Sequence, residues 1–93
     1  MIELNYEVIK IFIEGWLVGY HGFTLNDDHV EILNSSKLIV LQLHNSELKL
    51  KNVSEDRVLV SILLPENIDS KDCILIAIKS YLEIVQVIEK EKL

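Results

Sequence analysis

The sequence has little cysteine, proline, glycine or arginine. Its 93 residues include one Cys, one Pro, three Gly and a single Arg. A lone cysteine cannot form an internal disulfide, which excludes a disulfide-rich scaffold and favours a reducing compartment. Because turn-forming residues are scattered and no Pro- or Ser-rich tract occurs, we expect one domain covering residues 1–93.

Long apolar runs are also missing. The longest, residues 73–78, has six members, whereas a bilayer span needs roughly 20. The first residues carry no basic segment of the kind that opens a secretory signal. We therefore expect no membrane association and a cytoplasmic location.

Positive charge is scarce. Fifteen acidic and nine basic side chains give a net charge of −6. The nearest approach to a basic patch is Lys49 and Lys51, which share one face of a predicted strand. Proteins that bind nucleic acid directly need a basic surface to neutralise phosphates, so this class is not expected. An acidic surface instead favours basic surfaces on partner proteins.

Apolar side chains are abundant. They make up 49% of the chain, and the mean hydropathy is +0.27. A body this small has little interior, so a monomer leaves part of this apolar surface in water. Large exposed apolar patches usually mark interfaces. We therefore expect a homodimer and a protein partner.

Turn signals recur about every ten residues through the first two thirds of the chain, as expected of short antiparallel strands. Strands are predicted over residues 30–33, 38–43, 48–51 and 57–64. Because residues 38–41 are apolar on both faces, their strand should be central in the sheet or covered on both sides. The predicted fold class is α+β: an antiparallel meander of about five strands over a strand-rich 1–64, followed by a long C-terminal amphipathic helix packed on one face.

The first segment is ambiguous. Residues 2–8 alternate as in a strand, and a bulge near Val8–Ile9 explains why the alternation then changes phase. A helix is the alternative, since apolar residues between Val8 and Trp16 also fall at helical spacing. We favour a strand because β-branched residues crowd the segment. A second strand is predicted over residues 16–25.

The C-terminal helix is predicted over residues 70–92, about 35 Å long at 1.5 Å per residue. Asp69 or Ser70 is the expected N-cap, with Asp72 in the first turn. Its apolar face is wide enough to cover the sheet and also to pair with another helix, most simply that of a second copy. The predicted contact residues on this helix are Tyr81, Ile84, Val85 and Ile88.

Candidate chemistry is sparse. His21, His29 and His44 are metal-ligand types, but no pair has i, i+4 spacing and no Cys-x-x-Cys accompanies them. Cys73 falls in the first turn of the predicted helix, where the helix dipole would activate a thiol, but a small buried residue fits the position equally. We therefore expect no metal, cofactor or catalytic residue.

Two other segments are candidate contacts. Tyr20 and Phe23 lie in an aromatic segment, and such residues often anchor interfaces. Asp27 and Asp28 form an acidic loop, which either serves solubility or imitates a phosphate backbone before a basic groove.

Ile, Leu, Lys, Asn and Glu dominate the sequence, a composition typical of proteins encoded by AT-rich genes. In general character, a compact acidic chain of this composition resembles phage and mobile-element inhibitors, anti-CRISPR proteins among them, and toxin-immunity proteins. No motif carries this resemblance, so it assigns no residues. We expect a non-enzymatic protein that acts by occupying the surface of a partner protein. The alternatives are an assembly subunit, or a small ligand-binding or enzymatic domain that uses residues 16–23.

Overall fold

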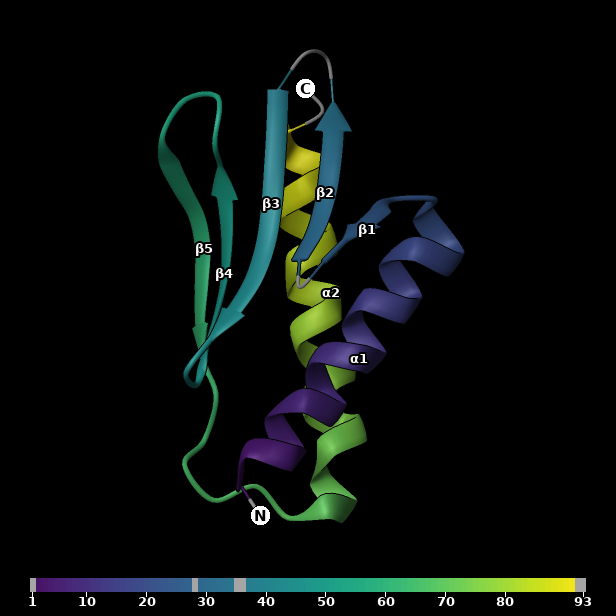
Figure 1. The fold of residues 1–93 in the computed structure, drawn as a ribbon, viewed down its shortest axis with the longest axis vertical. Coiled ribbons are helices and arrows are strands. Elements are labelled where there is room, and N and C mark those ends of the chain that lie inside the picture. Colours follow the sequence, from purple (N-terminus) through teal and green to yellow (C-terminus); the bar gives the residue numbers. More distant parts are fainter. Residues whose placement is uncertain (1, 28, 35–36, 92–93) are drawn as a thin grey trace.

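The chain folds into two helices and five strands, shown by a computed structural model that describes residues 2–27, 29–34 and 37–91 (Figure 1). The strands form one antiparallel sheet in the order β1-β2-β3-β4-β5. The predicted α+β class, the meander and the C-terminal helix packed on it are confirmed. The elements are α1 (Ile2–His21), β1 (Thr24–Asn26), β2 (His29–Asn34), β3 (Lys37–His44), β4 (Glu47–Asn52), β5 (Arg57–Leu63), the 3-10 turn η1 (Ser70–Asp72) and α2 (Cys73–Glu91).

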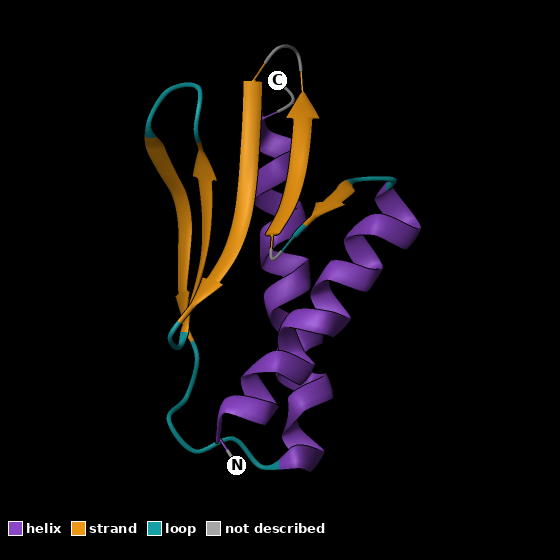
Figure 2. Ribbon diagram, in the orientation of Figure 1, coloured by secondary structure: helices purple, strands orange, loops and turns teal. Residues whose placement is uncertain are grey.

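Both helices lie on the same side of the sheet, with α2 running lengthwise and α1 packed against it (Figure 2). Alternate strand residues point toward the helices, as a sheet with one covered face requires. None of the helices in the described part of the chain is both long and apolar enough to span a membrane. The core joins all layers and consists of Ile9, Ile13, Leu17, Val30, Ile32, Ile39, Leu41, Leu48, Leu50, Leu64, Ile68, Cys73, Ala77, Ile84 and Ile88.

The N-terminal segment is a helix of 20 residues, so the strands predicted before residue 24 are wrong. Ile9, Ile13 and Leu17 are fully buried at spacings of four, whereas Ile11 is 63% exposed. A strand would place Ile11 on the same face as Ile9 and Ile13, so this burial pattern fits a helix. The change of phase at Val8–Ile9 is therefore the helical period rather than a bulge. Packing against α2 outweighs the weak strand preference of β-branched residues.

A glycine ends α1. Gly22 has φ +69°, and the N–H groups of Gly22 and Phe23 donate to the carbonyls of Val18 and Leu17. This left-handed residue closes the helix and turns the chain into β1. Asp27, Asn45 and Asp56 adopt positive φ in the strand connections, a conformation that Asp and Asn tolerate better than most residues.

The strands predicted over residues 30–33 and 38–43 pair as a hairpin. β2 pairs with β3, with Val30 opposite Leu41, and the apolar strand β3 is the central one, as predicted. Residues 35 and 36 of this hairpin lie outside the described residues.

The segment before α2 is tied to the start of α1. The side-chain amide of Asn5 donates to the carbonyl of Ile68, and the hydroxyl of Tyr6 donates to the carbonyl of Pro65 at 2.7 Å. Asp69 is the N-cap of η1, as predicted, but its side chain makes no capping bond.

Candidate functional site

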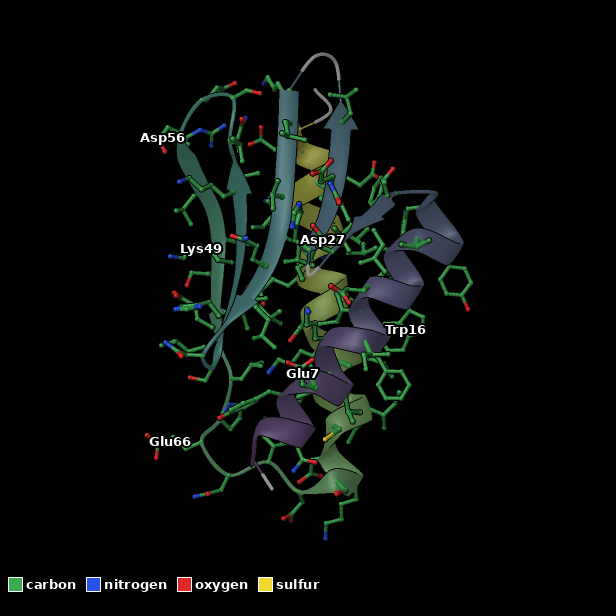
Figure 3. All side chains as sticks on the ribbon, viewed as in Figure 1. Glu7, Trp16, Asp27, Lys49, Asp56 and Glu66 are labelled. Carbon is green, nitrogen blue, oxygen red and sulfur yellow. The ribbon has the colours of Figure 1, made fainter. Side chains whose placement is uncertain are left out.

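A row of rings fills the seam between α1 and α2. Phe12 stacks on Trp16 with ring centroids 5.6 Å apart, and Trp16, which is labelled in Figure 3, meets Tyr81 edge-on at 5.4 Å. His21 Nε2 shares a hydrogen bond of 2.7 Å with the Tyr81 hydroxyl, and the His21 ring stacks on Phe23 at 5.4 Å. Within residues 16–23, Trp16 and His21 are therefore packed between the helices, whereas Tyr20 is exposed.

The other histidines lie elsewhere. His29 Nε2 is 3.0 Å from Glu31 Oε1, which also accepts from Asn26 Nδ2 at 3.1 Å. The bond from His29 is the main cause that lowers the pKa of Glu31. His44 is exposed at the end of β3. Among the described residues, no group of three His, Cys, Asp or Glu side chains is placed to hold a metal ion.

Cys73 is buried at the start of α2. Its sulfur lies 3.5 Å from the carbonyl oxygen of Asp69 and 3.9 Å from that of Asn5. His21, whose imidazole could otherwise serve as a base for a thiol, is bonded to Tyr81. The thiol therefore packs as a small side chain with weak hydrogen bonds to the backbone.

The predicted contact residues of the N-terminal third are partly at the surface. Tyr20 is 78% exposed near the end of α1, and Asp27 is exposed in the turn between β1 and β2. Phe23 is half-buried against His21. Asp28 lies outside the described residues. The role of these residues in binding stays a prediction.

The predicted contacts on α2 need a correction. Ile84 and Ile88 are buried in the core, and Tyr81 and Val85 are half-buried beside it. Ile84 and Ile88 therefore offer no surface to a partner. These residues lie on the half of the apolar face of α2 that points into the protein. With residues 2–21 predicted as strands, there was no α1 in the predicted fold to cover that half.

The uncovered half of α2 was missed. Leu75, Ile78 and Leu82 are 64%, 41% and 54% exposed. They follow one another at spacings of three and four, so they form a single stripe along the helix. The sequence did indicate this stripe, because α2 has more apolar residues than are needed to cover one face of the helix.

A hollow on the outer surface of α1 is a second exposed apolar feature. Ile11, Val18 and Leu25 line it together with Gly15, Gly19 and Glu14, which forms an ion pair with Lys10 at 3.9 Å. A Cβ atom added at either glycine would meet nothing within 4 Å. Neither glycine is therefore required by packing within the chain.

The outer face of the sheet carries paired charges. Lys49 Nζ is 3.6 Å from Glu47, and Lys51 Nζ is 3.1 Å from Asp56. Lys49 and Asp56 project from the β4–β5 hairpin away from the helices (Figure 3). The Ser61 hydroxyl donates to Glu47 and lowers the pKa of that carboxyl. The lysines that came nearest to a basic patch are thus neutralised by neighbouring acids.

A charge network fastens the C-terminal end of α2 to the sheet. Arg57 Nη2 donates to both oxygens of Glu91, at 3.1 and 3.3 Å, and this bond raises the pKa of Arg57. Lys37 Nζ lies 3.3 Å from Glu55 and 4.0 Å from Glu91. Two basic and two acidic groups thus join β3, β5 and α2.

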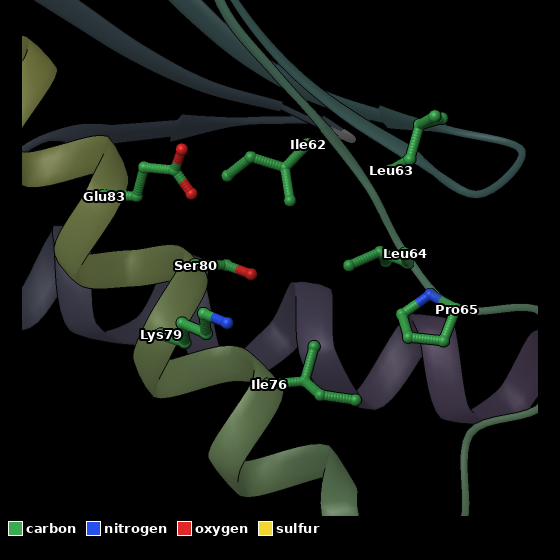
Figure 4. A pocket seen from close by; sticks show the side chains of 8 residues that line it. All are labelled: Ile62, Leu63, Leu64, Pro65, Ile76, Lys79, Ser80 and Glu83. Atoms are coloured by element: carbon green, nitrogen blue, oxygen red, sulfur yellow. The ribbon is translucent and has the colours of Figure 1, made fainter.

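A cleft separates β5 from α2 (Figure 4). It holds about 290 Å³ and lies where the last strand of the sheet diverges from the helix. Ile62 and Leu64 project into it from one side and Ser80 from the other, whereas Leu63 points away. Ile76, Lys79, Glu83 and Pro65 complete the lining.

The cleft borders an open sheet edge. β5 is the last strand in the sheet order and, among the described strands, pairs only with β4. Leu59, Val60 and Ile62 on β5 are only half-buried against the core, which means that the helices cover this edge incompletely. A strand with one free edge beside an apolar cleft is the arrangement by which sheets accept an added strand.

The chain matches no protein-family model, and neither the curated proteins nor the solved structures contain a match to it.

Proposed function

We propose that this chain is a non-enzymatic protein-binding protein that holds an extended segment of a partner protein along β5. The observation that carries the proposal is the apolar cleft beside an open sheet edge (Figure 4). Occupying a segment that the partner needs for its own contacts would make the chain an inhibitor without chemistry of its own.

Strand addition divides recognition into two parts. Backbone N–H and C=O groups on the free edge of β5 would bond the added strand and supply affinity. Every second side chain of that strand would face the helices, because strand side chains alternate. The proposed ligand therefore carries an apolar residue that enters between Ile62, Leu64 and Ile76. Lys79 and Glu83 at the mouth offer one charge of each sign to its neighbours.

The test uses a random peptide library panned on the purified full-length chain. Enriched peptides are then titrated by calorimetry against wild type and two matched variants. Ile62→Thr alters the cleft and Leu63→Thr alters the opposite face of the same strand, with the same residue type introduced. We expect at least a tenfold loss of affinity for Ile62→Thr and less than about twofold for Leu63→Thr.

Thermal unfolding of both variants checks that the sheet is intact. Slowed amide exchange along β5 on peptide binding would support strand addition. The absence of any enriched peptide, or equal losses in the two variants, would contradict the proposal.

A further inference from the structure

The uncovered apolar stripe of α2 has a charged residue beyond each of its ends. Leu75, Ile78 and Leu82 form its apolar centre. One helical step before Leu75 stands Lys71, exposed in η1, and beyond Leu82 the same line passes Val85 and reaches Glu89. The spacings from 71 to 89 alternate between four and three, which is the seam of a helix that pairs with another helix. α1 does not cover this line, because it packs on the neighbouring face through Trp16 and Tyr81.

The order of residues along this stripe fits a second copy of itself in reverse. If two α2 helices lie antiparallel about a two-fold axis at the level of Ser80, residues pair when their numbers add up to 160. Ile78 then faces Leu82, Leu75 faces Val85, and Lys71 faces Glu89 of the partner subunit. All apolar layers meet apolar layers, and the two-fold repeats each contact, as an isologous interface requires.

Charge decides between the two directions. In the antiparallel pair, Lys71 and Glu89 form an ion pair at both ends of the seam. In a parallel pair, Lys71 would face Lys71 and Glu89 would face Glu89, which places like charges together. A carboxylate accepts from several donors, so a contact of Glu89 within its own chain is compatible with this pairing.

The size of the stripe matches what a dimer needs. With Ile74, which is 39% exposed at its border, the exposed apolar side chains offer roughly 400 Å² per subunit, or about 800 Å² for the pair. Lys71, Val85, Gln86 and Glu89 add to this area along a helix about 28 Å long. Full covering of the stripe would therefore bring the total close to the roughly 1,000 Å² that separates specific interfaces from incidental contacts.

We infer that the chain forms a two-fold homodimer through antiparallel pairing of α2, with Leu75, Ile78 and Leu82 at its centre and Lys71–Glu89 pairs at its ends. The β5 cleft lies on another flank of α2, so dimer formation and the proposed peptide binding fail or succeed separately.

The experiment is sedimentation equilibrium of the full-length chain from low to high micromolar concentration. Wild type is expected to dimerise, and Leu82→Glu is expected to raise the dimer Kd at least tenfold, since the seam would bury an unpaired charge. Leu33→Glu, at an exposed site on the outer face of β2, is the matched control and should leave the Kd within about twofold. Thermal melts establish that both variants are folded.

A charge swap tests the direction of pairing. Lys71→Glu and Glu89→Lys should each weaken the dimer, and the double variant should restore it. Lys71 in η1 and Glu89 near the end of α2 are separated by about 27 Å at a helical rise of 1.5 Å per residue, beyond the screening length of about 8 Å, so restoration can arise only between subunits. A wild type that stays monomeric throughout, a dimer indifferent to Leu82→Glu, or a double variant no better than the singles would overturn the inference.

Discussion

Helix α2 has two apolar faces, and only one of them is covered. Ala77, Ile84 and Ile88 on the inner face are buried, while Leu75 and Leu82 on the outer face lie mostly in water. The two faces are alike in residue type and in helical spacing. What separates them is the position of α1 and the sheet. The apolar pattern of a helix therefore predicts how much of its circumference is apolar. Which part of that surface is buried in the core depends on the elements that pack against the helix.

The largest expected effect comes from shortening one residue on each face. Ile84→Ala should lower the free energy of unfolding by about 2–5 kcal/mol, because it leaves a cavity among close-packed neighbours. Leu82→Ala should change it by no more than about 0.5 kcal/mol when the protein is dilute enough to be monomeric. Urea unfolding followed by circular dichroism measures both. Equal losses would show that the two faces are equally buried.

The outer surface of α1 allows a stabilising change of intermediate size. Gly15 and Gly19 lie inside the helix, where glycine is less favourable than alanine by about 0.8–1.0 kcal/mol each. Since nothing occupies the space above them, Gly15→Ala and Gly19→Ala should each raise the free energy of unfolding by close to that amount. Gly22→Ala is the control and should destabilise, because residue 22 has φ +69°. A loss of stability at Gly15 or Gly19 would mean that this surface is covered.

The border between the covered and uncovered faces is held by the hydrogen bond between His21 and Tyr81. Tyr81→Phe removes the hydroxyl and keeps the ring against Trp16. We expect a loss of about 1 kcal/mol, the usual net value of one hydrogen bond. Tyr20→Phe, at an exposed position one residue from His21, should be nearly neutral. If the two variants lose equal stability in urea unfolding, the bond contributes nothing.

Much of the fold was predictable because the strands and α2 have clear patterns in the local sequence. The alternation of Leu48, Lys49, Leu50 and Lys51 could belong only to a strand with one wet face, and β4 has that burial pattern. The start of α2 followed from the acidic turn around Asp69. These patterns depend only on residues close together in the sequence, so they can be recognised without knowledge of the tertiary fold.

The N-terminal helix was not predictable in the same way. Residues 2–8 alternate as in a strand, while the apolar residues between Val8 and Trp16 also fall at helical spacing. The two interpretations are separated only by the tertiary fold, in which Ile9 and Ile13 are buried and Ile11 is exposed where α1 packs on α2. With residues 2–21 predicted as strands, nothing in the predicted fold covered Ile84 and Ile88, so both were predicted to make an intermolecular contact. The β5 cleft has no local signal either, because it arises where the sheet extends past α2.

The smallest expected effect concerns the charge network that holds the end of α2 to the sheet. Hydrogen bonding from Lys37, followed by the charge of Lys37, lowers the pKa of Glu55 below its ordinary value of 4.5. A carboxyl whose pKa is lower in the folded state stabilises the fold above the unfolded pKa and loses that contribution as the pH falls through the folded one. Glu55→Gln should therefore lower the Tm by roughly one to three degrees at pH 7, because exposed ion pairs contribute little.

That difference should shrink as the pH falls through the lowered folded-state pKa of Glu55, because the wild-type carboxyl then takes up a proton in the folded state as well. It should also shrink in high salt, which screens exposed pairs. Glu66→Gln, in the loop between β5 and η1, is the matched control. Scanning calorimetry of the three proteins from pH 7 downward decides the matter: a Tm difference for Glu55→Gln that stays equally large as the pH falls would show that the side chain acts through packing rather than through its charge.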